Sequence, residues 1–296
     1  MYAVIGANGY LGSYIIKNIL DLTKEQIIAT TRNLSNVNNT ERVEWMFCDV
    51  QDESSVKKLV NKMKGIQEEV NVVYLAAYHH PDEVQKNQKL AWNINVTALS
   101  KFLEEIKGNV NCVFYASTDS VYGESINRYR FKEDDKLHPV NFYGHCKCAA
   151  ESLIIHQGYN VVRFPFLISP SLVNKKHFYD QIVENLRAGH EIEMYRDSYR
   201  SSLSFDNASY LLVKLMRKKS VPQIVNICGD NDLSKYEVGR MIAEKEKLDA
   251  SKVIPITLET VRKHFESPRA MSTLMDNSLL KECLELKQVN IFSVPC

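Results

Sequence analysis

Tyr143 and Lys147 are the residues whose types and spacing most directly suggest chemistry. They stand four apart in PVNFYGHCKCAAE (139–151), and on a helix that spacing places both side chains on one face. A tyrosine hydroxyl has a pKa of about 10, so it is a poor acid–base catalyst at neutral pH unless a neighbouring ammonium stabilises its phenolate. Thr118 ends an apolar run, and its hydroxyl can hold a substrate oxygen against Tyr143. Because a Tyr-x-x-x-Lys pair is common by chance, its meaning depends on the elements that position it.

An apolar segment followed by regularly spaced glycines opens the chain. Tyr2–Ile5 has the composition of a strand buried on both faces, and LGSYIIKNIL (11–20) has helical periodicity. A glycine-rich turn between a strand and a helix directs free N–H groups and the positive helix end at one point, which suits a phosphate. The alternative is an ordinary turn. As a dinucleotide turn it predicts these cofactor-binding residues: Gly6, Asn8, Gly9, Tyr10, Leu11 and Gly12.

Strand-like and helix-like segments alternate through the first half of the chain. The expected strands after the first are 26–30, 44–50, 71–77, 111–117 and 159–164, with helical patterns such as DESSVKKLVNKM between them. Regular alternation of this kind predicts an α/β fold, a Rossmann-type doubly wound parallel sheet.

The end of the second expected strand bears on the choice of cofactor. In a dinucleotide fold this position reaches the adenosine ribose, and an acidic residue there accepts the 2′-hydroxyl. This chain has Thr31 and Arg32 instead, and arginine is suited to a 2′-phosphate. We therefore expect NADP(H) as the preferred cofactor, with NAD(H) possible. The alternative is that Arg32 is a solvated loop residue.

Composition and charge exclude several classes of function. The chain of 296 residues is 45% hydrophobic and 25% charged with a net charge of +1, so it has no basic footprint for nucleic acid or an anionic membrane. No apolar run approaches the ~20 residues of a membrane span, and no secretory signal precedes the first strand. The seven scattered cysteines, Cys146 and Cys148 among them, lack the spacing of a metal site. We expect a cytoplasmic protein with reduced cysteines and no metal.

At this point the chain resembles the extended short-chain dehydrogenase/reductases. The resemblance implies that Thr118 polarises the substrate carbonyl, that Tyr143 passes it a proton, and that Lys147 binds the nicotinamide ribose and tunes Tyr143. It implies cofactor contacts from Asp49 and Val50 at the adenine, from the 75–77 loop, and from Phe166 in the loop that covers the nicotinamide. Asn95, also expected among the cofactor-binding residues, lies by the same resemblance in the helix beneath, as a structural or proton-relay residue. The residues that carry the resemblance outside the catalytic set are Gly6–Gly12, Asp49, Val50, Leu75, Ala76, Ala77 and Asn95.

The second half resembles the substrate-binding part of the same family. The resemblance implies that Arg200 and Arg269 grip the diphosphate of a sugar nucleotide, although a single surface arginine is usually solvated. It also implies a strand within 200–207 that returns to the main sheet and a final helix capped by Asp276. Independently of the resemblance, Ser234 with Glu237 three residues later has the spacing of a capping box at the start of a helix. His79 is a candidate substrate contact, the alternative being a plain loop position. The implied division is a dinucleotide-binding domain (1–164, with a return segment at about 200–228) and a smaller C-terminal substrate lobe (165–199 and 229–296).

One departure from the family narrows the expected reaction. Nucleotide-sugar dehydratases follow the active-site threonine with Asp-Glu, whereas this chain has Asp119 and Ser120, and a serine cannot replace that carboxylate. The pattern is similar to that of dTDP-4-dehydrorhamnose reductases. It implies NADPH-dependent reduction of a nucleotide-activated 4-keto-6-deoxy sugar, in deoxysugar or polysaccharide biosynthesis. The alternatives are an epimerase with tightly bound cofactor and a non-catalytic regulatory subunit, as in methionine adenosyltransferase. Helices are expected around 90–107 and 143–156, and a homodimer through these helices is a family-level expectation.

Overall fold

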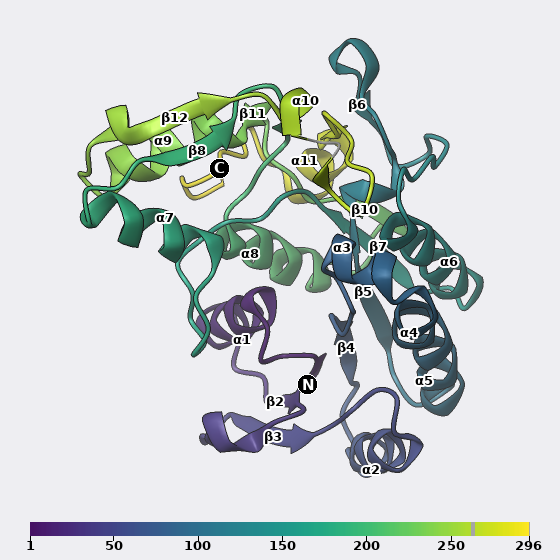
Figure 1. Ribbon diagram of the computed structural model, residues 1–296. Coiled ribbons are helices and arrows are strands. Elements are labelled where there is room, and N and C mark those ends of the chain that lie inside the picture. Colours follow the sequence, from purple (N-terminus) through teal and green to yellow (C-terminus); the bar gives the residue numbers. More distant parts are fainter. Residues whose placement is uncertain (262–263, 296) are drawn as a thin grey trace.

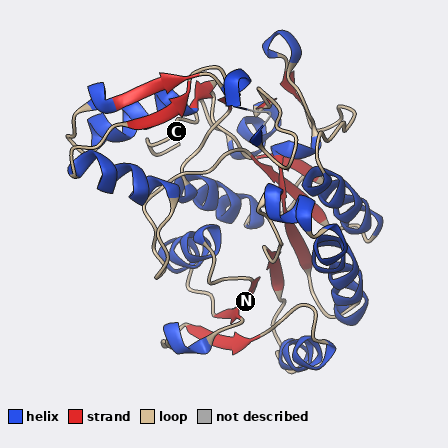
Figure 2. Ribbon diagram, viewed as in Figure 1, coloured by secondary structure: helices blue, strands red, loops and turns tan. Residues whose placement is uncertain are grey.

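Seven parallel strands form the central sheet of the computed structural model, which describes residues 1–261 and 264–295 (Figures 1 and 2). Their order is β10-β7-β5-β4-β1-β2-β3, so the order reverses between β1 and β4, where ligands of such sheets bind. This arrangement confirms the expected doubly wound fold. The strands are β1 (Tyr2–Ile5), β2 (Ile27–Thr31), β3 (Val43–Phe47), β4 (Asn71–Tyr74), β5 (Cys112–Thr118), β7 (Asn160–Phe164) and β10 (Ile224–Asn226).

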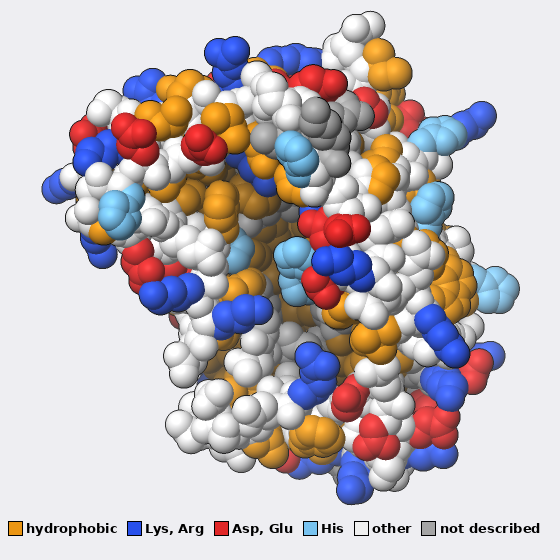
Figure 3. All heavy atoms as spheres, viewed as in Figure 1, with side chains coloured by type: hydrophobic (Ala, Val, Ile, Leu, Met, Phe, Trp, Pro, Cys, Tyr) orange, Lys and Arg blue, Asp and Glu red, His pale blue; other side chains and the backbone are white. Residues whose placement is uncertain are grey.

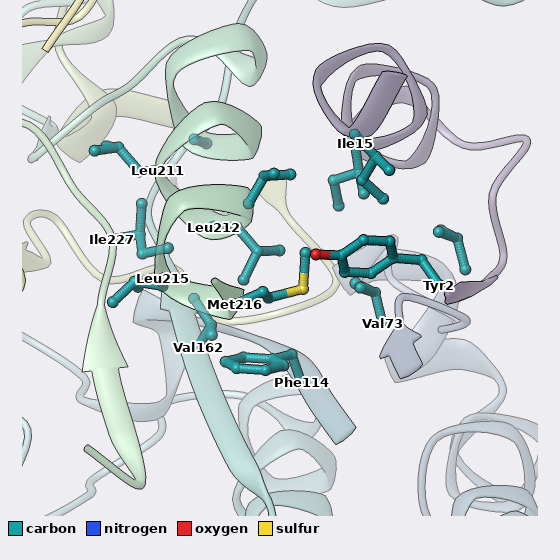
Figure 4. Packing of buried hydrophobic residues seen from close by; sticks show 14 of the residues in the cluster. Tyr2, Ile15, Val73, Phe114, Val162, Leu211, Leu212, Leu215, Met216 and Ile227 are labelled. Atoms are coloured by element: carbon teal, nitrogen blue, oxygen red, sulfur yellow. The ribbon is translucent and has the colours of Figure 1, made fainter. Parts of the chain in front are cut away.

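Helices cover both faces of the sheet. The face that Figure 4 shows packs Ile15 of α1 and Leu212 of α8 against Val73 and Phe114 of the strands. The opposite face packs helices α2, α5 and α6. Strands β1 and β2 are buried on both sides and carry apolar or small side chains throughout, which is why these short runs lack alternation. The covering helices are α1 (Tyr10–Leu22), α2 (Glu53–Lys64), α5 (Ala98–Ile106), α6 (Phe142–His156), α8 (Phe205–Met216) and α11 (Ser278–Leu284).

The helix expected over 90–107 is interrupted. Helix α4 (Gln88–Trp92) continues into a π-helical turn (Asn93–Thr97) and then into α5, and the short α3 (Pro81–Lys86) precedes them. A π turn inserts an extra residue and changes the direction in which the next helical residues face. Asn95 lies within this turn and faces the loop after β4.

A smaller lobe has a hydrophobic core of its own. It contains Tyr179, Ile182, Val238 and Ile242 among its buried residues, and Figure 1 shows its elements away from β1–β3. The capping box expected of Ser234 and Glu237 is confirmed at the start of α9. The boundary at residue 164 stays a prediction. The lobe and its neighbours comprise α7 (Phe178–Arg187), β8 (Ile192–Tyr195), β9 (Tyr199–Arg200), β11 (Leu233–Ser234), α9 (Lys235–Lys245), β12 (Val253–Ile256) and α10 (Leu258–Val261).

Two local expectations in the second half were wrong: the return of a strand within 200–207 to the main sheet, and Asp276 as the N-cap of the final helix. Strand β9 pairs with β11 outside the main sheet, and the chain returns to that sheet only at β10. The reason is that Ser204 caps α8, whose helix packs on α1 before the chain can re-enter the sheet. The final helix begins at Ser278 with Asn277 as its N-cap, although the Asp276 carboxylate accepts a hydrogen bond from the Ser278 N–H at 2.9 Å. A further two-stranded pair joins β6 (Arg130–Phe131) and β13 (Leu274–Met275).

The helices of the described segments include none with the length and apolar character needed to span a membrane. Within the same segments, no group of three or more histidine, cysteine or acidic residues is placed to hold a metal ion. One of the seven cysteines, Cys296, lies outside the described residues.

Candidate active site

A cavity of about 1180 Å³ lies between the carboxyl ends of the sheet strands and the smaller lobe. Figure 3 shows this side hollowed, with hydrophobic side chains on its floor and lysine and arginine side chains beside it. Of the site residues predicted from the sequence, Asn95 is not part of its wall. The others line it: Gly6, Asn8, Gly9, Tyr10, Leu11, Gly12, Arg32, Asp49, Val50, Leu75, Ala76, Ala77, His79, Thr118, Tyr143, Lys147, Phe166, Arg200 and Arg269.

The glycine turn meets the steric requirements of a dinucleotide site. Gly6 has φ +82°, and a Cβ on it would lie 3.0 Å from the Ala76 backbone nitrogen. A Cβ on Gly12 would overlap the Ala7 carbonyl oxygen, so helix α1 can approach β1 only with glycine there. A Cβ on Gly9 would meet only the Gly6 carbonyl oxygen, at 3.4 Å, and would project into the cavity. The turn therefore leaves room for a phosphate group beside Gly9.

The start of α1 supplies donors for that phosphate. The helix begins at Tyr10, and its N-cap Gly9 has no side chain to accept hydrogen bonds from the first turn. The N–H groups of Tyr10, Leu11 and Gly12 consequently have no acceptor within the helix. Together with the helix dipole, they form an anion site at the cavity wall. This part of the chain fits the pyrophosphate of a dinucleotide.

Polar side chains gather where β2 ends. Thr30 Oγ1 accepts a hydrogen bond from the Gly6 N–H at 3.0 Å, which ties the glycine turn to this strand. Arg32 is exposed at the cavity edge, and Asn33 and Asn36 lie on the same wall. Neither asparagine was singled out from the sequence, because a loop of polar residues has no distinguishing spacing. The group fits a hydrogen-bonding site for the adenosine ribose and its substituent.

Lys147 is buried at the cavity wall that Thr118 and Tyr143 also line, with 3% of its surface exposed. Its ammonium donates to the Ala116 carbonyl oxygen at 2.6 Å and lies 4.2 Å from the centre of the Tyr115 ring. Burial lowers the pKa of Lys147 to about 7, although the Glu151 carboxylate opposes this shift. The pKa of the Lys147 ammonium is therefore close to neutral pH, and its charge depends on what else occupies the cavity.

Tyr143 lies on the same face of α6 as Lys147, as the four-residue spacing predicts. Burial, followed by the nearby Asp119 carboxylate, raises the pKa of the Tyr143 hydroxyl above its usual value. The Tyr143 hydroxyl is accordingly neutral at pH 7 and holds a proton that it can donate.

Thr118 is placed by the end of β5. Its hydroxyl accepts a hydrogen bond from the Ser120 N–H at 3.2 Å and donates to Asp119 Oδ1 at 3.2 Å. Asp119 itself is 6% exposed, and burial raises the pKa of its carboxyl while Arg200 opposes that rise. Asp119 was named from the sequence only as a neighbour of Thr118, so its place beside Arg200 is a result of the tertiary structure.

The two arginines on the lobe side both have partners within the chain. Arg200 donates to the backbone carbonyl oxygens of Tyr199 at 2.7 Å, Met271 at 3.0 Å and Ala270 at 3.0 Å. Its Nε lies 3.5 Å from Asp119 Oδ2. Arg269 donates to Asp82 Oδ2 at 2.7 Å. Each arginine thus faces the cavity with a carboxylate already beside it.

Lys235 is a cavity residue that the sequence analysis missed. It is the first residue of α9, and its ammonium lies 5.3 Å from the centre of the Phe166 ring and 5.6 Å from that of Tyr195. Burial, then Arg200 and Arg269, lower its pKa to about 8. The capping box located the start of α9 in the sequence, but nothing local could show that this helix end faces the cavity.

Asn95 acts at a distance from the cavity. Its side chain is 2% exposed, its Oδ1 accepts from the Tyr78 N–H at 2.8 Å, and its Nδ2 donates to the Tyr78 carbonyl oxygen at 2.9 Å. These bonds hold the backbone next to His79, which is exposed at the cavity edge. Asn95 is therefore placed to position the loop after β4, without contacting the cavity.

Comparison with known proteins places the chain in a family. The model of the RmlD substrate binding domain matches residues 2–290. Among curated proteins, methionine adenosyltransferase 2 subunit beta of Danio rerio is 25% identical over 301 residues, covering 99% of this chain and 86% of that one.

Solved structures share the fold over nearly the whole length. The dTDP-4-dehydrorhamnose reductase of Bacillus anthracis in complex with NADP superposes with a TM-score of 0.75 at 19% identity, covering 96% of both chains. The UDP-glucuronic acid 4-epimerase of Bacillus cereus in complex with UDP-glucuronic acid and NAD gives 0.78 at 16% identity, covering 96% of this chain and 92% of that one. These structures show the shared fold, and the family match identifies the chain as a member of the RmlD substrate binding domain family, in agreement with the resemblance to nucleotide-sugar members of the extended short-chain dehydrogenase/reductases.

Proposed function

We propose that this protein is an NADPH-dependent reductase of a nucleotide-activated 4-keto-6-deoxy sugar. The observation that carries the proposal is the meeting of Thr118, Tyr143 and Lys147 on the wall of the cavity that the glycine turn also lines. One end of this cavity suits a dinucleotide and the other end is cationic, so both reactants have a place beside Tyr143.

The chain's own residues account for binding of the cofactor. The N–H groups at the start of α1 hold its pyrophosphate, and Arg32 pairs with the 2′-phosphate, which is the basis for preferring NADPH over NADH. Asp49, Val50 and the 75–77 loop border the adenine and the adjoining part of the cofactor, and Phe166 covers the nicotinamide. NADPH, when bound, supplies the hydride for the keto carbon.

Proton delivery is the task of Tyr143. The Thr118 hydroxyl holds the keto oxygen of the sugar, and the Tyr143 hydroxyl donates its proton to that oxygen as the carbon is reduced. Its raised pKa keeps the hydroxyl protonated until then. The Lys147 ammonium stabilises the phenolate that remains. A positioned general acid of this kind contributes about 10²–10⁴-fold to the rate.

A substrate panel tests the proposal. The purified chain is mixed with NADPH or NADH and with dTDP-, UDP-, GDP- or CDP-linked 4-keto-6-deoxy sugars, and oxidation of the cofactor is followed at 340 nm. We expect turnover with at least one sugar, faster with NADPH than with NADH. No oxidation with any member of the panel would overturn the reductase assignment.

A second candidate function comes from the curated relatives. Proteins named methionine adenosyltransferase 2 subunit beta match 94–99% of this chain at 25–26% identity. Under this second candidate function, the chain would be an NADP(H)-binding subunit of a larger enzyme, and the cavity would serve binding alone. A Tyr143→Phe chain that fully complements a deletion strain would favour this function over the reductase.

An epimerase remains the alternative within enzymes, since the epimerase of Bacillus cereus shares the fold. It would keep its cofactor through gel filtration and show no net oxidation while the sugar changes configuration. A homodimer and a cytoplasmic location are further parts of the proposal. Sedimentation velocity and fractionation of cells expressing the tagged chain test them.

A further inference from the structure

Unlike Arg200 and Arg269 on the same side of the cavity, Lys235 has no counter-ion among the described residues. Its ammonium makes no ion pair or hydrogen bond with any residue in the described part of the chain, and its contacts are the faces of Phe166 and Tyr195. Aromatic faces attract a cation, but they do not neutralise it. A half-buried cation without a partner is costly, so its retention on a cavity wall points to a ligand that supplies the missing negative charge.

Arg200 and Arg269 are less available to a ligand than their positions on the cavity wall suggest. Arg200 uses its N–H groups on the carbonyl oxygens of Tyr199, Ala270 and Met271, and its charge faces Asp119. The charge of Arg269 faces Asp82, which also accepts from the Ser267 N–H at 3.0 Å. Arg200 and Arg269 therefore each have a carboxylate partner, whereas Lys235 has none in the described part of the chain.

Lys235 also lies near residues that the proposed function assigns to each of its two ligands. It contacts Phe166, which lies in the loop expected over the nicotinamide, and it is close enough to Arg200, Arg269 and Asp119 for each to influence its charge. A group bound beside Thr118 and extending toward the arginines would pass the ammonium. In a nucleotide sugar, the diphosphate occupies that position, between the sugar and the nucleoside.

We propose that Lys235 contacts the diphosphate of the nucleotide sugar and supplies most of the charge that binds it, while Arg200 and Arg269 are held by the protein and shape the wall. This inference rests on the proposed function only for the class of substrate, a nucleoside diphosphate sugar. It shifts the diphosphate contact from the arginines that the family resemblance singled out to a residue on α9.

Binding of nucleosides and their diphosphates tests the assignment without turnover. Thymidine, uridine, guanosine and cytidine and their diphosphates are titrated into the NADPH-loaded chain by calorimetry, and the gain in affinity from nucleoside to diphosphate is measured for the best base. A hydrogen bond to a charged group contributes about tenfold or more in affinity. We expect Lys235→Met to reduce the gain by that factor and Lys235→Arg to restore part of it.

Lys245→Met is the matched control, because Lys245 lies on the same helix and also over two aromatic rings, Tyr179 at 6.0 Å and Phe292 at 4.6 Å, but outside the cavity wall. We expect this variant to bind like the unmodified chain. The affinity of the Lys235→Met chain for NADPH should stay within twofold, which shows that the chain is folded.

Several results would overturn the assignment. They are an unchanged diphosphate gain in Lys235→Met, an equal loss of NADPH affinity in that variant, or a wild-type chain that binds no nucleoside diphosphate. A chain that binds a diphosphate through Lys235 but reduces no sugar would refute the reductase and leave this assignment standing. If the wild-type chain reduces a sugar and the Lys235→Met variant binds the nucleoside diphosphate as tightly as wild type, only the assignment of Lys235 is refuted.

Discussion

The Lys147 ammonium donates a hydrogen bond to the carbonyl oxygen of Ala116 at 2.6 Å, which ties the middle of α6 to the end of β5. Glu151 is the carboxylate that influences its pKa, and the Glu151 oxygens accept hydrogen bonds from the Arg163 guanidinium and the Ser117 hydroxyl. The burial of the Lys147 ammonium thus costs stability.

Lys147→Met should abolish reduction and make the protein more stable at neutral pH. Below pH 7 the ammonium is charged in both states, and burial penalises it only in the folded state. Between pH 7 and 10.5 the unfolded chain keeps a proton that the folded chain releases, so wild-type stability rises with pH. Thermal unfolding should show the variant melting at least about 2 °C higher at pH 7, with a smaller difference at pH 10. Lys58→Met, at an exposed position, is the control. A Lys147→Met chain that is less stable than wild type at pH 7 would contradict the cost that we assign to burial of this ammonium.

Tyr143→Phe removes the proton donor and little else, because the ring keeps its packing. We expect kcat/KM for the sugar to fall by about 10²–10⁴-fold, while the dissociation constant for NADPH changes less than twofold. Stopped-flow reduction and fluorescence titration of NADPH measure the two quantities. Retention of more than a tenth of the wild-type rate would assign the proton transfer to another group.

Gly9 and Gly12 should respond differently to the same substitution. Gly12→Ala places a Cβ against the Ala7 carbonyl and should lower the melting temperature, whereas Gly9→Ala meets only the Gly6 carbonyl oxygen, at 3.4 Å. Gly9→Ala should therefore fold normally and bind NADPH at least tenfold more weakly, since its methyl group occupies the space of the phosphate. Calorimetry and thermal unfolding of both variants check this. Equal effects on folding would show that the turn is only structural.

Arg32→Gln tests the choice of cofactor. Loss of a charge-assisted hydrogen bond to the 2′-phosphate should raise KM for NADPH by about tenfold or more and leave KM for NADH unchanged. NADH is thus the internal control. Parallel loss with both cofactors would place Arg32 near a group that they share.

Asn95→Ala should destabilise the loop after β4. It removes both bonds to the Tyr78 backbone and leaves buried polar groups without partners, at a cost of about 1–3 kcal/mol in the free energy of unfolding. Urea unfolding measures this cost. Asn93→Ala, an exposed position on the same π turn, should cost much less. Equal costs would show that the Tyr78 contact is not the source of the effect.

Local spacing by itself determined the parts of this protein that depend on neighbours in the chain. The strand, glycine turn and helix at residues 2–22 follow from composition and periodicity, and the shared face of Tyr143 and Lys147 follows from helix geometry. The Ser234–Glu237 capping box is local in the same way. The alternation of segments was enough for the sheet, because parallel strands with helical crossovers have few topologies.

Only the tertiary structure decided which distant residues share the cavity. Arg200 meets Asp119, and Arg269 meets Asp82, across long stretches of chain that no periodicity relates. Lys235 reaches the cavity because α9 packs on β8 and β12 of the lobe, and Asn95 meets Tyr78 through a π turn. Such contacts depend on how the lobe and the sheet pack together. Residue types at fixed short spacings carry no information about that packing.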